Sequence, residues 1–206
     1  KKDARNGMFP PKLAQMLINI AKPEVGATIF DPFCGSGTVL QEAILMGYKA
    51  SGSDFDAKQI MDCKENVQWL LREAKMQANP LIFMKDATKL SKDDLPSGKF
   101  VIVTETYLGP QMSHAPSEAD MKKIQSEIET LYENFFSNMK KIAPGTTIVF
   151  TAPYYKSGND RFFLPHLLQI LEKHTTIEAL SEHERPSLFY ERKDQTVGRE
   201  IWKVRV

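Results

Sequence analysis

Short apolar runs rich in β-branched residues alternate with longer segments of helical periodicity along most of the chain. Apolar runs between turn residues are typical of buried strands, and apolar positions three and four residues apart predict helices. The clearest helical stripe runs from Met121 to Ile142. The predicted strands are 28–33, 48–55, 80–87, 100–105 and 146–155. The predicted helices are 11–21, 38–47, one that begins after residue 55 and includes Ala74, 117–142, and one from Asn159 or Asp160 to Leu171.

The last part of the chain has a different pattern. Residues 187–192 and 199–206 are two β-type segments joined by a turn, and together they predict an antiparallel hairpin. Upstream of them, strands that alternate with helices imply a parallel sheet covered by helices on both faces. We therefore predict one α/β domain over residues 1–206, with a mostly parallel sheet and a C-terminal antiparallel hairpin.

Composition sets limits but does not identify a function. The chain has 206 residues, of which 42% are hydrophobic and 26% charged, as in an ordinary globular protein, and its net charge of +1 does not by itself indicate a nucleic-acid partner. Cys34 and Cys63 form neither a disulfide framework nor a zinc spacing, which favours reduced thiols in a cytoplasmic protein. No apolar run approaches the roughly 18 residues of a membrane span, so we expect no membrane attachment. The abrupt start on KKDARNG is compatible with a domain cut from a longer chain.

The most informative stretch is TIFDPFCGSGTVLQEA, residues 28–43, in which a predicted strand ends in a glycine-rich turn that opens a helix. Gly35 and Gly37 have no Cβ, so a ligand can approach the backbone N–H groups of this turn closely. No lysine follows Gly37, which excludes a P-loop, and the G-x-G-x-x-G spacing is also absent. Asp31, at the end of the strand, would repel a phosphate and attract an ammonium group.

Acidic residues follow three successive predicted strands, namely Asp31, Asp54 and Asp86. In an open α/β sheet, ligands bind outside the carboxyl ends of the strands. An acid after the second strand is placed to hold ribose hydroxyls, and Asp86 could reach an exocyclic amine, although a plain turn role for Asp86 stays open. A ligand with an amino acid part, a ribose and an adenine fits this pattern, which indicates S-adenosylmethionine.

DPFCGSGT, residues 31–38, resembles the cofactor-binding motif of class I S-adenosylmethionine-dependent methyltransferases, in the version found in enzymes that methylate amino groups of nucleic acids. RNGMFPPKLAQMLINIA and FYERKDQTVGREIW resemble segments of the THUMP-type tRNA guanine-N2 methyltransferases. The resemblance implies a Rossmann-like, seven-stranded fold whose sixth and seventh strands form the hairpin. It also implies S-adenosylmethionine as cofactor, S-adenosylhomocysteine as product, and a guanine amino group in RNA, with tRNA favoured, as acceptor. In that family an RNA-binding THUMP domain precedes the catalytic domain.

The same resemblance implies roles for particular residues. Asp31 would contact the methionine amino group, and Asp54 the ribose. Phe55 would pack on the adenine, whose amine Asp86 would meet, and the segment 1–21 would cover the cofactor. The implied cofactor-binding residues are Phe9, Pro10, Asp31, Pro32, Phe33, Cys34, Gly35, Gly37, Thr38, Asp54, Phe55, Asp86, Ala87 and Glu105.

The catalytic prediction depends on TETYLGP, residues 104–110. Amino-methylating members of the group have an Asp or Asn here, then two prolines and an aromatic. The side-chain oxygen and a backbone carbonyl accept the amine hydrogens and localise its lone pair, while the aromatic stacks on the base. In this chain Glu105 takes the place of the acid, and Thr106 and Tyr107 replace the prolines. We predict Glu105 and Tyr107 as catalytic residues, with direct methyl transfer and no metal.

Alternative functions follow from the same motifs. The altered Glu-Thr-Tyr-Leu stretch is compatible with a different acceptor or with a non-catalytic S-adenosylmethionine-binding module. A DNA adenine-amino methyltransferase shares the glycine loop but needs a target-recognition region for which 206 residues leave no room. The glycine spacing disfavours a nicotinamide-dependent dehydrogenase. The near-neutral charge predicts weak RNA binding by this chain alone. Basic side chains cluster on the terminal hairpin, where they could contact phosphates, but we favour a solvated surface: Arg185, Arg192, Lys193 and Arg199.

Overall fold

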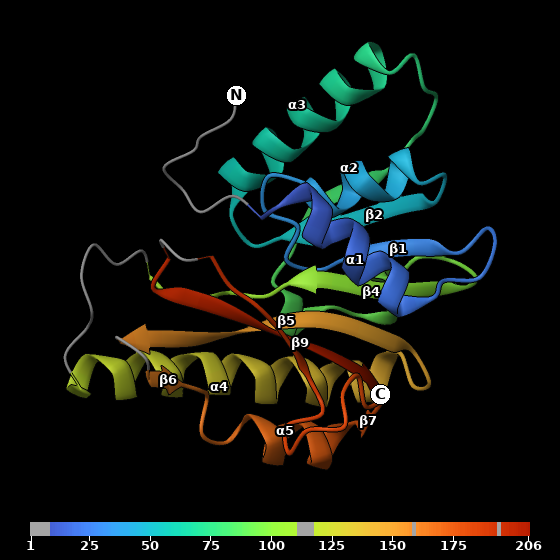
Figure 1. The fold of residues 1–206 in the computed structure, drawn as a ribbon. Helices are drawn as coiled ribbons and strands as arrows, with labels where there is room; N and C mark the ends of the chain where they lie inside the picture. The colour runs from blue at the N-terminus through green and yellow to red at the C-terminus, as the bar shows by residue number, and fades with distance from the viewer. Residues whose placement is uncertain (1–8, 111–117, 158–159, 193–194) are drawn as a thin grey trace.

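A twisted sheet runs through the molecule, with helices packed on both of its faces (Figure 1). The computed structural model describes residues 9–110, 118–157, 160–192 and 195–206. The helices are α1 (Pro11–Ala21), α2 (Thr38–Leu45), α3 (Ala57–Glu73), α4 (Glu118–Ile142) and α5 (Leu167–His174), with two short 3₁₀ turns, η1 (Ala87–Lys89) and η2 (Lys92–Asp94). The strands are β1 (Thr28–Asp31), β2 (Lys49–Asp54), β3 (Leu81–Met84), β4 (Phe100–Glu105), β5 (Thr147–Ser157), β6 (Asp160–Phe162), β7 (Thr176–Ile177), β8 (Leu188–Tyr190) and β9 (Val197–Arg205).

The strand order places the carboxyl ends of β1, β2 and β4 side by side. The main path of the sheet is β3-β2-β1-β4-β5-β9-β7, and its pairs are parallel from β3 to β5. The strand order reverses between β1 and β4, and ligands bind at such a point in open α/β sheets. β9 lies antiparallel between β5 and β7. The predicted α/β class, with a mostly parallel sheet and antiparallel C-terminal strands, is confirmed.

The predicted hairpin is present, but two short strands were missed and one strand position was assigned wrongly. β8 and β9 pair antiparallel, with Tyr190 opposite Arg199. Seven strands lie on the main path of the sheet, but the hairpin strands were expected to be the sixth and seventh. The strand next to β9 at the end of this path is β7, and β8 is not part of the path. β6 and β8 pair outside this path, so the described residues form nine strands in all. Strands of two or three residues are too short to show an alternating pattern, which is why the sequence did not reveal β6 and β7.

The predicted helix from Asn159 or Asp160 to Leu171 is wrong in its first part. Asp160 begins β6, which pairs with the end of β5, and the helix α5 starts only at Leu167. Asn159 lies outside the described residues. Pro165 explains the difference, because the residue before a proline is disfavoured in helical conformation and the chain therefore cannot continue a helix through this position. The other predicted helices and strands are confirmed, with ends that shift by a few residues.

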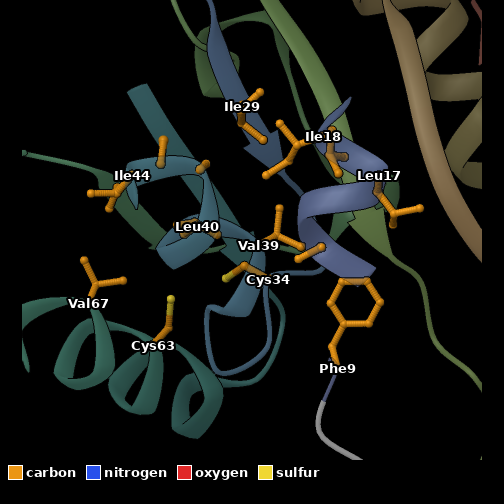
Figure 2. Close-up of a cluster of buried hydrophobic side chains, with 14 of the residues drawn as sticks. Phe9, Leu17, Ile18, Ile29, Cys34, Val39, Leu40, Ile44, Cys63 and Val67 are labelled. Carbon is orange, nitrogen blue, oxygen red and sulfur yellow. The ribbon is translucent and has the colours of Figure 1, made fainter. Parts of the chain in front are cut away.

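Separate apolar clusters hold the helices on the two faces. Figure 2 shows the cluster that joins α1, α2 and α3 to β1, with Phe9 at the start of α1 and the thiols of Cys34 and Cys63 pointing toward each other. Both cysteines are free and buried. On the opposite face aromatic residues of α4, including Tyr132 and Phe136, share a buried cluster with leucine and isoleucine side chains of α5. This packing fixes the ends of β1, β2 and β4, where the predicted site residues lie.

Candidate functional site

The loop after β1 needs glycine at two positions for different reasons. Gly37 has φ +91°, and a Cβ there would lie 2.6 Å from the Cys63 Sγ, so both its conformation and its space exclude a side chain. Gly35 has φ +49°, and within 4 Å a Cβ there would meet only Gln59 Oε1, at 3.8 Å. The backbone at Gly35 therefore faces open space, as a ligand cradle requires. Asn66 closes the far side of the loop, where its Nδ2 donates to the Ser36 carbonyl (2.9 Å).

Asp31 is a buried acid at the end of β1. Its Oδ1 accepts hydrogen bonds from the Phe33 N–H (3.1 Å) and the Thr104 hydroxyl (2.6 Å). Burial raises the pKa of Asp31 to about 8; the two hydrogen bonds oppose this rise, and the charges of Asp54 and Glu105 add to it. Asp31 thus lies close enough to the carboxyl groups of Asp54 and Glu105, on the strands to either side, to be influenced by both, which favours a positively charged ligand.

Asp54 ties the glycine loop to the end of β2. Its Oδ2 accepts from the Gly35 N–H and its Oδ1 from the Asp56 N–H, each at 2.9 Å. Burial raises the pKa of Asp54, and these hydrogen bonds oppose the rise. The next residue, Phe55, is 76% exposed although it is a large aromatic. A buried acid beside an exposed ring is the arrangement that a ribose and a stacked base would need.

Glu105, at the end of β4, pairs with Arg199 of β9. The Arg199 Nε donates to the Glu105 Oε1 at 2.5 Å, and only 4% of the Arg199 side chain is exposed. Burial raises the pKa of Glu105, and the charge of Arg199 opposes the rise. Thr151 of β5 lies opposite Glu105 of β4 on one side and Ile201 of β9 on the other. Arg199 precedes Ile201 by two residues, so the side chains of Arg199 and Glu105 lie on the same face of the sheet. Arg199 is the functional candidate that sequence reasoning missed.

The prediction of a solvated basic hairpin is therefore wrong for two of its members. Arg199 is buried, and the Arg185 guanidinium pairs through Nε with Glu200 Oε1 at 2.6 Å, where Glu200 is fully buried. Arg192 is exposed, and Lys193 lies outside the described residues. An arginine next to a glutamate, directly before the apolar pair Ile201 and Trp202 of β9, was the available signal, since charged residues are rarely buried unless they are paired.

The loop after β4 lacks prolines but is held by side-chain hydrogen bonds. The buried Thr106 hydroxyl contacts the Tyr132 hydroxyl and donates to the Thr151 carbonyl (2.7 Å), and the Tyr155 hydroxyl donates to the Leu108 carbonyl (3.0 Å). Tyr107 remains 47% exposed between these anchors. Its ring is therefore accessible to a ligand.

The remaining predicted residues surround this group. Phe9 and Pro10 are buried at the start of α1, and residues 1–8 of the predicted covering segment lie outside the described residues. Asp86 caps η1, where its Oδ1 accepts from the Thr88 N–H (2.9 Å) and hydroxyl (2.7 Å), which agrees with the turn role left open for it. The other members lie in or directly after the glycine loop or in η1: Pro32, Phe33, Cys34, Thr38 and Ala87.

Two further findings concern the described residues as a whole. No helix among them is both long and apolar enough to span a bilayer. Within the same ranges, His, Cys, Asp and Glu side chains form no group of three or more that could hold a metal ion.

Known proteins resemble the chain in sequence and in fold. Residues 1–160 match the family model described as the RMKL-like methyltransferase domain. A tRNA (guanine(10)-N2)-dimethyltransferase of Methanothermobacter thermautotrophicus is 30% identical over 151 residues, which cover 72% of this chain and 40% of that protein. The protein of the same name from Pyrococcus abyssi is 28% identical over 125 residues, which cover 60% of this chain and 35% of the relative.

Solved structures support the fold assignment. TrmN from Thermus thermophilus has a TM-score of 0.64 and 18% identity, over 98% of this chain and 51% of that one. The magnesium protoporphyrin IX methyltransferase of Synechocystis, solved with bound SAM, has a TM-score of 0.58 and 16% identity, over 95% and 77% of the two chains. The chain spans less than half the length of both curated tRNA relatives.

Proposed function

Because the chain belongs to the RMKL-like methyltransferase domain family, we propose that it transfers a methyl group from S-adenosylmethionine to the N2 amino group of a guanine in tRNA. The observation that carries this proposal is the grouping of Asp31, Asp54 and Glu105 at the carboxyl ends of three neighbouring strands, beside the glycine loop. The guanine acceptor is proposed from the tRNA methyltransferases that this chain resembles. It is a proposal because the matched region covers only 40% of the first of these relatives. We treat residues 1–206 as one methyltransferase domain.

The residues at this edge of the sheet fit S-adenosylmethionine. Asp31 would hold the ammonium group, since a buried carboxyl with a pKa near 8 gains from a cation beside it. The open space in front of Gly35 would take the methionine part. Asp54 would accept from the ribose hydroxyls, and the exposed ring of Phe55 would stack on the adenine. When bound, the cofactor supplies an electrophilic methyl group on a positively charged sulfur.

Glu105 and Tyr107 would act on the acceptor. The lone pair of an exocyclic amine is delocalised into the base, so the amine is a weak nucleophile. A hydrogen bond from the amine to Glu105 localises the lone pair on nitrogen, and the ring of Tyr107 holds the base by stacking. Methylation leaves the nitrogen positively charged, and the loss of one proton, which Glu105 Oε2 can accept, restores a neutral amine.

Two observations favour an enzyme over a module that only binds the cofactor. The loop that carries Tyr107 is anchored by Thr106 and by the Leu108 carbonyl, so it does not need the prolines of related enzymes to be held in place. Glu105 keeps a buried counter-ion in Arg199.

We expect RNA binding by this chain alone to be weak, because a net charge of +1 releases few counterions from RNA. Since tRNA is the proposed substrate, the cytoplasm is the proposed location.

Methyl transfer to unmodified tRNA transcripts tests the proposal. The chain is incubated with isotope-labelled S-adenosylmethionine, and the digested nucleosides are separated and identified by mass spectrometry. We expect label in N2-methylguanosine, and strongly reduced label with Glu105→Ala. Label in an adenosine amino group, or no label from a protein that binds S-adenosylhomocysteine, would contradict the proposed acceptor. A tight, strongly salt-dependent complex with RNA would contradict the expectation of weak binding.

A further inference from the structure

We propose that the Glu105–Arg199 ion pair selects guanine as the base to be methylated. Arg199 keeps Glu105 as a carboxylate, a group that only accepts hydrogen bonds. Such a group fits a purine edge with two adjacent N–H donors, which guanine presents at N1 and N2. This inference rests on the proposed function and deepens it, because it assigns substrate specificity to two residues of the same site. Arg199 is a positioning residue in this account, since it acts on the base through Glu105.

The geometry of the pair supports a fixed orientation of the carboxylate. The Arg199 Nε lies 2.5 Å from the Glu105 Oε1, and the exposed fractions of the two side chains are 4% and 18%. The Arg199 guanidinium also lies 6.0 Å from the centre of the Phe9 ring, at the start of α1. Within the described ranges, Glu105 is the one acid that pairs with this buried arginine. Loss of the arginine would therefore leave Glu105 buried without its counter-ion.

One carboxylate oxygen remains available to a ligand. In the part of the chain that the structure describes, the polar contact of the Glu105 side chain uses Oε1 and comes from Arg199. An ionised carboxylate offers about four lone-pair sites, so Oε2 and a second site on Oε1 can accept two further N–H groups. The Glu105 side chain is also more exposed than that of Arg199, so the acid is the more accessible member of the pair.

The protonation state of Glu105 decides which base edge fits. A carboxylate accepts from both the N1–H and the N2–H of guanine. Adenine and cytosine place an acceptor nitrogen beside their amino group, and a carboxylate opposite that nitrogen meets like partial charge. A protonated carboxyl offers one donor and one acceptor and loses this selectivity. Three groups interact electrostatically with the charge of Glu105: Asp31 from β1, Tyr132 from α4 and Arg199 from β9.

A pair of matched RNA acceptors tests the inference. The first carries guanine at the methylated position, and the second carries 2-aminopurine, which keeps the N2 amino group but has an acceptor at N1. We expect the wild-type chain to favour guanine in kcat/KM by roughly 10- to 100-fold. Glu105→Gln replaces two acceptors by one acceptor and one donor, so it should reduce or invert this preference.

Variants of Arg199 separate positioning from folding. Arg199→Met should lower the guanine preference at pH 7, and the preference should recover as the pH rises and Glu105 ionises. Arg199→Lys keeps a charge and should retain most of the preference. The control is Arg185→Met, which removes the arginine of the neighbouring Arg–Glu pair on the same hairpin, and it should leave the preference unchanged. The preference is a ratio measured on one sample, so partial unfolding lowers both rates and leaves the ratio intact.

The outcomes distinguish this inference from the function on which it rests. Equal methylation of both purines by the wild-type chain would overturn the inference alone. A guanine preference in Arg199→Met that matches the wild type at every pH would also overturn the inference alone. So would a loss of preference in Arg185→Met as large as the loss in Arg199→Met. Failure of the wild-type chain to methylate any guanine-containing RNA, despite binding S-adenosylhomocysteine, would overturn the proposed function itself.

Discussion

Replacement of Asp31 by asparagine should stabilise the free protein at neutral pH while it weakens cofactor binding. Burial raises the pKa of Asp31 from 3.8 to about 8, so the folded chain keeps a proton that the unfolded chain releases between these values. Below pH 4 both states hold the proton, and the stability associated with this group is fully present. As the pH rises toward 8 the unfolded state gains by ionising, and that stability is lost.

The size of the effect follows from the pKa difference. One pKa unit corresponds to about 1.4 kcal/mol, so between pH 4 and pH 7 the loss from this one carboxyl is on the order of 4 kcal/mol. Asparagine cannot ionise in this range, and its Oδ1 still accepts the hydrogen bonds from the Phe33 N–H and the Thr104 hydroxyl. The variant should therefore show a free energy of unfolding that changes much less with pH.

Urea denaturation at several pH values between 5 and 8, with and without S-adenosylhomocysteine, measures both effects. The control is Asp93→Asn, which neutralises an exposed acid in η2. For the wild type we expect the affinity for S-adenosylhomocysteine to rise from pH 6 to pH 8, since Asp31 must release its proton to hold the ammonium group. At pH 8 the Asp31→Asn variant should bind roughly 10- to 100-fold more weakly, as expected for the loss of a charged hydrogen bond.

Two results would refute this reasoning. The first is an Asp31→Asn protein whose stability depends on pH as steeply as that of the wild type. The second is wild-type affinity for S-adenosylhomocysteine in the variant at pH 8, which would remove Asp31 from the cofactor site.

Three further substitutions test the loop, the stacking ring and the anchor. Gly37→Ala should lower the free energy of unfolding by about 1–3 kcal/mol, because the new Cβ would lie 2.6 Å from Cys63 Sγ at φ +91°; an unchanged urea midpoint would contradict this. Phe55→Ala should change stability by less than about 0.5 kcal/mol, since the ring is 76% exposed, but weaken S-adenosylhomocysteine binding several-fold; equal affinity would exclude stacking. Tyr155→Phe should lower the free energy of unfolding by about 1 kcal/mol, and it should lower kcat while the KM for the cofactor changes little. An unchanged kcat would show that the hydrogen bond from the Tyr155 hydroxyl to the Leu108 carbonyl is not needed for catalysis.

The parts of the site that sequence could predict are those carried by contiguous residues. Asp31 and the glycine loop stand in one strand-turn-helix unit, and the alternation of strands and helices predicts that Asp54 and Glu105 end strands of the same sheet. Local pattern is sufficient for these positions because the carboxyl ends of neighbouring parallel strands meet at one edge. The three acids expected to form one group were Asp31, Asp54 and Asp86. The structure places Asp31 close to Asp54 and to Glu105, whereas Asp86 caps η1.

The contacts that sequence could not predict join distant segments. Arg199 and Glu105 are 94 positions apart, and their pairing depends on the register of β9 against β5, which no local pattern specifies. The anchoring of the loop after β4 depends likewise on Tyr132 and Tyr155, which come from other elements. The resemblance drew attention to the missing prolines, whereas the hydrogen bonds that take over their role require the tertiary structure.

Calorimetric titration with S-adenosylhomocysteine tests most directly whether this edge of the sheet holds the cofactor. The wild-type chain is compared with Asp54→Ala and with the control Asp93→Ala, which changes an exposed acid in η2. We expect saturable binding at one site, weakened in Asp54→Ala and unchanged in Asp93→Ala. The absence of saturable binding by the wild-type chain at millimolar ligand would contradict the assignment of this edge as the cofactor site.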